Sequence, residues 1–76
     1  MQEKHVLTEE QTAEMRSKWL KFGSKIDPEK YEMGLHFLGR PKAVLTTNQL
    51  FLLIVNITKS GGIVEEWTYE LMGDKQ

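Results

Sequence analysis

The feature that most constrains the fold of this chain is an uninterrupted apolar run of six residues, Leu50 to Val55. Such a run is typical of a buried strand or of a segment of a buried helix. It is far shorter than the roughly 20 apolar residues that a membrane-spanning helix needs. We therefore expect a core built around this run and no insertion into a membrane.

The residues around the run favour β-strands. Ile, Val, Thr, Trp and Tyr are concentrated between residues 54 and 69, and these types are enriched in strands. The sequence Ser60-Gly61-Gly62 is a typical hairpin turn, and apolar and polar residues alternate after it. We predict strands over about residues 43–46, 49–59 and 63–72, with the last two joined as a hairpin.

Two helices are predicted ahead of the strands. Thr8 and Gln11 have the spacing of a capping box, which predicts a helix over about 9–22. Asp27-Pro28 is a second start signal, for a helix over about 28–38. With residues 1–7 expected to be frayed, the prediction for the single domain 1–76 is an α+β fold, α-α-β-β-β. In this fold the two N-terminal helices pack on one face of a three-stranded antiparallel meander.

A helical alternative remains open for the C-terminal half. Leu50, Leu53, Ile54 and Ile57 also have the spacing of one helix face, and Gly61 could end that helix. Residues 64–71 fit a helix as well. Periodicity does not decide between the two, so the alternative prediction is an all-α, helix-turn-helix-like domain.

The predicted hairpin has consequences for function. Two helices can cover one face of a three-stranded sheet, so the second face would keep large apolar side chains that mark an interface. With a two-residue turn, that face carries Phe51, Leu53, Val55, Ile57 and Val64; a three-residue turn would place Leu50, Leu52 and Ile54 there instead. The hypothesis is a small interaction module, acting as a regulator, inhibitor or assembly factor. It would bind a second copy of itself or a larger protein, unless the chain's own loops cover the face.

Charge makes nucleic acid a second candidate partner rather than the favoured one. Ten Lys and Arg against eleven Asp and Glu give a net charge of −1, which is no basis for binding duplex DNA. A local basic patch is still conceivable on the first helix and in the loop around Pro41. Its residues would be Arg16, Lys18, Lys21, Lys25, Arg40 and Lys42.

The sequence carries no recognisable catalytic or metal-binding motif. Cysteine is absent, and His5 and His36 are the only histidines, without the spacing of a metal-ligand pair. No serine lies in a nucleophile elbow, and Ser60-Gly61-Gly62 lacks the rest of a phosphate-binding loop. We expect no enzyme, no metal and no cofactor. The lack of cysteine in so small a domain is typical of a reducing compartment, the cytoplasm.

Overall fold

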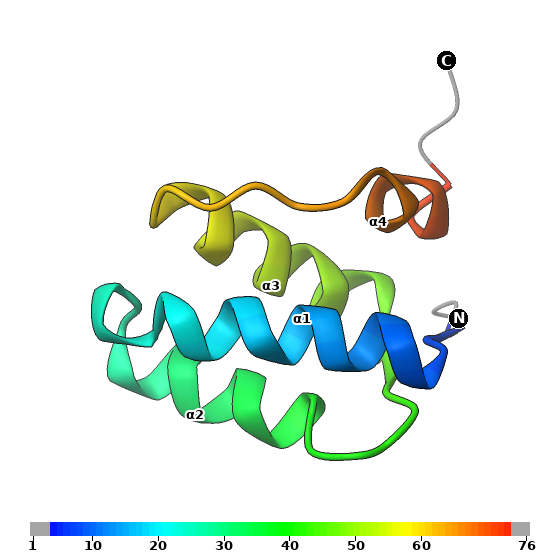
Figure 1. The fold of residues 1–76 in the computed structure, drawn as a ribbon, viewed down its shortest axis with the longest axis horizontal. Helices are drawn as coiled ribbons and strands as arrows, with labels where there is room; N and C mark the ends of the chain where they lie inside the picture. The colour runs from blue at the N-terminus through cyan, green and yellow to red at the C-terminus, as the bar shows by residue number, and fades with distance from the viewer. Residues whose placement is uncertain (1–3, 74–76) are drawn as a thin grey trace.

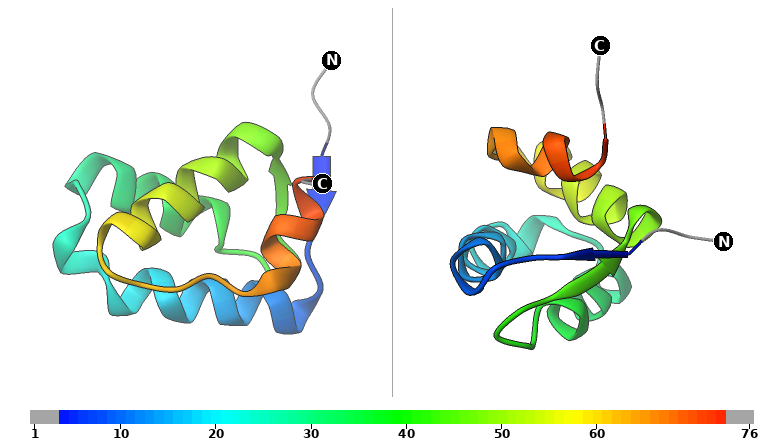
Figure 2. Two further views of the ribbon diagram at one scale, coloured as in Figure 1. Left: turned by 90° about the horizontal axis from the view of Figure 1, so that it is seen from above. Right: turned by 90° about the vertical axis from the view of Figure 1, so that its right-hand side faces the viewer.

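Helix α1 contacts both of the other long helices, α2 and α3 (Figure 1). This computed structural model describes residues 4–73. Its elements are, in order, β1 (Lys4–Val6), α1 (Glu9–Lys21), the 3-10 turn η1 (Gly23–Lys25), α2 (Pro28–Phe37), β2 (Val44–Thr46), α3 (Thr47–Lys59) and α4 (Glu66–Leu71). Viewed end on, α1, α2 and α3 form the corners of a triangle, with α4 beyond α3 and the short strands at one end (Figure 2, right).

The predicted three-stranded meander is wrong. Residues 47–59 form α3, and the segment predicted as the last strand contains α4. The apolar run is buried with helical spacing, since Leu50, Leu53, Ile54 and Ile57 are all 6% exposed or less. Burial of this face outweighs the weak strand preference of the β-branched residues. The all-α alternative is closer, but it lacks the small sheet of β1 and β2.

Both ends of α3 are fixed by local hydrogen bonds. At the start, Thr46 Oγ1 accepts from the Gln49 amide at 3.2 Å, and Gln49 Oε1 accepts from the Thr46 amide at 2.9 Å. At the end, the Gly62 amide donates to the Ile57 carbonyl and the Gly61 amide to that of Thr58, while Gly61 has φ of +97°. This is a Schellman motif, so the predicted hairpin turn is a helix stop.

Helices α1 and α2 lie where the sequence predicts helices. The Thr8–Gln11 capping box is present with both hydrogen bonds at 3.0 Å, whereas the Asp27 side chain makes no cap bond to α2. Trp19 of α1 is fully buried against α2: its Nε1 donates to the Tyr31 carbonyl at 2.9 Å, and the two rings stack. Gly34 lies under the indole, where a Cβ would overlap the ring.

The only sheet in the described part of the chain joins segments far apart in sequence. Strand β1 pairs antiparallel with β2, with Lys4 opposite Thr46 and Val6 opposite Val44. The expectation that residues 1–7 are frayed is therefore wrong for residues 4–7, and residues 1–3 lie outside the described range. Leu7 is fully buried and its amide donates to the Ala43 carbonyl at 2.9 Å. The two-stranded sheet covers the core at the end where α3 begins.

Candidate functional site

The five residues predicted as an interface do not share one surface. Leu53 and Ile57 are fully buried, and Val64 is 7% exposed. Phe51 is 54% exposed and Val55 half-buried, both on the side of α3 turned away from the core. The alternation that grouped the five belongs to a strand, and in a helix it divides them between core and surface.

A shallow apolar hollow runs along the outer side of α3. Phe51, Leu52 and Val55, which we call the α3 strip, form its floor, and they recur within about one helical turn. Polar side chains surround the strip. The complete lining is Lys30, Asn48, Phe51, Leu52, Val55 and Asn56.

A second hollow, of about 450 Å³, opens between the outer face of the small sheet and the C-terminal end of α2. Its lining residues come from both strands, α2, the loop after α2 and the first turn of α3. We call it the cationic hollow because three of these residues are basic or His; the lining is Lys4, His36, Phe37, Arg40, Val44, Thr46 and Gln49. The two hollows are lined at consecutive residues of the first turn of α3, Asn48 in the first hollow and Gln49 in the second.

The charged side chains that line the two hollows are basic. Among residues 4–73, no aspartate or glutamate lines either hollow. The single ion pair that the structure shows among residues 4–73 is Lys18–Glu65, on another side of the molecule. The described lining of the two hollows therefore combines apolar side chains with the basic residues Lys4, Lys30 and Arg40, although the whole chain has a net charge of −1.

The structure disperses the predicted basic patch. Arg16 points to the end of α2, where Nε donates to the Leu38 carbonyl at 2.8 Å and Nη2 to the Arg40 carbonyl at 2.9 Å. Lys18, two residues on and so nearly opposite on the helix, bonds the C-terminal segment instead. Of the remaining members, Lys21 Nζ lies 5.6 Å from the centroid of the Phe22 ring and Lys25 ends η1. Arg40, which lines the cationic hollow, and the exposed Lys42 both lie in the loop after α2 that Arg16 contacts.

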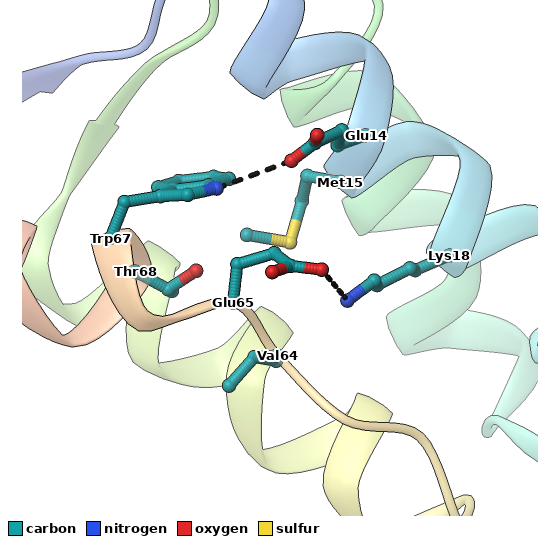
Figure 3. Close-up of a pocket in the computed structure, with 7 residues that line it drawn as sticks. All are labelled: Glu14, Met15, Lys18, Val64, Glu65, Trp67 and Thr68. Atoms are coloured by element: carbon teal, nitrogen blue, oxygen red, sulfur yellow. Dashed lines mark hydrogen bonds and ion pairs between the residues drawn. The ribbon is translucent and has the colours of Figure 1, made fainter.

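A third site is a narrow crevice between α1 and the C-terminal segment (Figure 3). Trp67 Nε1 donates to Glu14 Oε1 at 3.2 Å, and Lys18 Nζ lies 3.2 Å from Glu65 Oε2 and also donates to the Ile63 carbonyl. The crevice has no room for a water molecule. These contacts hold the C-terminal segment on α1, and we assign them a structural role.

The described residues give no sign of a metal centre, since no three His, Asp or Glu side chains of residues 4–73 are grouped to hold an ion. Nor does that range contain a helix of the length and hydropathy needed to cross a membrane. The chain has no significant match to a protein-family model, a curated protein or a solved structure.

Sequence reasoning missed most of the residues that line the two hollows. Lys4 and His36 are brought together only by the pairing of β1 with β2, for which the sequence gives no local signal. One signal was available: Thr46 and Gln49 have the capping-box spacing. A helix starting there places Phe51 and Val55 on the face opposite Leu50 and Leu53, which would have located the α3 strip.

Proposed function

We propose that this protein is a non-enzymatic interaction module that binds an acidic amphipathic helix of a partner protein along the α3 strip. The observation that carries the proposal is the half-exposed Phe51, set in an apolar hollow whose lining within the described part of the chain includes no acidic residue. The lack of cysteine makes the cytoplasm the expected setting.

The position of the strip supports a helical ligand. Helix α3 packs its buried side on α1, and the described lining of the hollow on its outer side consists of side chains of α3 itself and Lys30 of α2. A helix needs only a narrow apolar stripe to dock, and helix axes pack 8–10 Å apart. A partner helix lying on Phe51, Leu52 and Val55 would thus add one more helix to the bundle on its open side.

Charge supports an acidic partner over a second copy of this chain. A symmetric dimer through the α3 strip would bring the two copies of this face together, each with Lys30, Lys4 and Arg40. Like charges placed across an interface disfavour association. A partner helix with glutamates beside its apolar stripe meets the same cations with opposite sign.

The test is binding of a designed peptide of about 15 residues, with leucines at i, i+3, i+4 and i+7 and glutamates on the flanks. Phe51 is 54% exposed, so docking would bury about half of its side chain, contributing about 1 kcal/mol. Phe51→Ala should therefore weaken binding about five-fold in a calorimetric titration.

Leu20→Ala is the matched control. Leu20 is 53% exposed, nearly the same fraction as Phe51, but it lies on α1 and lines neither hollow. Its removal should leave peptide affinity unchanged. Equal losses in the two variants, or tighter binding of a peptide with lysines in place of the glutamates, would contradict the proposal. Preferential binding of a random oligonucleotide would point to nucleic acid instead.

A further inference from the structure

We infer that the cationic hollow binds a phosphate monoester, carried by a phosphorylated serine or threonine at one end of the partner helix. The inference deepens the proposed function and rests on it for the identity of the partner. It stands on the donor groups that line the hollow, on the basic charge of both linings and on the consecutive residues of α3 that line the two hollows.

Four polar side chains that line the hollow have hydrogen-bond donors available for a ligand. Thr46 Oγ1 and Gln49 Oε1 already accept backbone amides in the capping box of α3, so the hydroxyl hydrogen and the amide NH2 remain to donate. Lys4 and Arg40 can only donate. A phosphate monoester has three strong acceptor oxygens and a charge of about −1.5 to −2, which fits several convergent donors better than one carboxylate does.

The backbone beside the hollow also favours an anion. The carbonyls of Leu38 and Arg40, at the C-terminal end of α2, would repel one, but both accept hydrogen bonds from Arg16. The guanidinium of Arg16 thereby adds positive charge behind the loop. On the other side, α3 begins at Thr47 with no acidic residue in its first turn, so the positive end of its dipole is not offset there.

The two hollows can serve one ligand. From Val55 back to Asn48 the outer side of α3 is about 10 Å long, and Gln49, the residue after Asn48, lines the cationic hollow. A helix lying along the α3 strip would bring one terminus to this hollow. A phosphate there would be held by Lys4 of β1 and by Arg40 of the loop after α2.

The test uses the designed acidic peptide with serine or phosphoserine at the end nearest Gln49. Phosphorylation should tighten binding, and Arg40→Ala and Lys4→Ala should each weaken binding of the phosphopeptide about two- to five-fold and binding of the unphosphorylated peptide less. Lys59→Ala is the control of equal charge, because Lys59 is exposed on α3 and lines neither hollow. It should have no such effect.

Titrations with inorganic phosphate and with adenosine monophosphate test the phosphate site independently of peptide binding. They also distinguish a phosphopeptide from a nucleotide as its ligand. Phosphate that shifts the amide resonances of Thr46 and Arg40 supports the hollow even if no peptide binds, in which case only the proposed function fails. The inference is overturned if peptide binding depends on Phe51 but not on phosphorylation or Arg40. It is equally overturned if adenosine monophosphate or an oligonucleotide binds the hollow more tightly than the phosphopeptide.

Discussion

Replacing Gly34 by alanine sets two effects of opposite sign against each other. Helix propensity alone predicts that Ala in α2 is better than Gly by about 1 kcal/mol. In the structure the new Cβ would lie 2.5 Å from Trp19 Nε1 and nearer still to the indole carbons, so the ring would have to move by roughly 1 Å. Trp19 is fully buried and cannot move outward.

Overpacking of this kind costs about 1–3 kcal/mol. Displacing the ring also weakens the hydrogen bond from Trp19 to the Tyr31 carbonyl, worth about 1 kcal/mol, which offsets the gain in propensity. We therefore expect Gly34→Ala to lower the free energy of unfolding by about 1–3 kcal/mol in urea titrations followed by circular dichroism.

Two comparisons test the reasoning. A Cβ at Gly39 meets only the Leu35 and His36 carbonyl oxygens, the nearer at 3.3 Å, so Gly39→Ala should change stability much less. In a Trp19→Phe background, which removes Cζ2 from the atoms that a new Cβ would meet, Gly34→Ala should cost less than in the natural chain. If Gly34→Ala is as stable as the natural protein, the close packing of α1 on α2 described here is wrong.

Three further substitutions probe the other elements, each by urea unfolding. Thr68 is 1% exposed and its hydroxyl has no hydrogen-bond partner among residues 4–73, so Thr68→Val should raise stability by about 1 kcal/mol; a loss would mean that the hydroxyl is paired. Thr46→Ala removes the cap of α3 and should cost about 1 kcal/mol, whereas a strand at 49–59 would have no cap to lose. Gly61→Ala forces a residue with a Cβ to φ of +97° and should cost about 1 kcal/mol; no cost would argue against the Schellman motif.

Local chemistry explains which parts of the fold the sequence could predict. Thr8 and Gln11 fix the start of α1 through bonds between near neighbours, and Pro28 fits the first turn of α2. These signals depend on little beyond their own segment, so they can be recognised without knowing the tertiary structure.

The prediction for the C-terminal half was wrong because one short sequence suits two different local structures, a hairpin turn and a helix stop. Gly61 adopts a positive φ, as hairpin turns and helix stops both require, so Ser60-Gly61-Gly62 suits either. The β-branched residues of α3 then favoured the wrong choice, although the spacing of Leu50, Leu53 and Ile57 was helical.

The candidate site was harder to predict than the fold. Phe51 and Val55 were expected at a surface, and they lie at one, but the prediction put them on a sheet face that does not exist. The cationic hollow depends on a ladder that joins Lys4 to Thr46, and no property of either segment alone predicts that pairing.

The most direct test of the central claim is an amide chemical-shift map of the protein titrated with the unphosphorylated acidic peptide. The account predicts that the largest shifts fall on the outer side of α3 and its flank, at Asn48, Phe51, Leu52, Val55 and Lys30, with the chain monomeric throughout. Shifts centred on the crevice of Glu14 and Trp67, or a dimer formed through α3 without peptide, would contradict it.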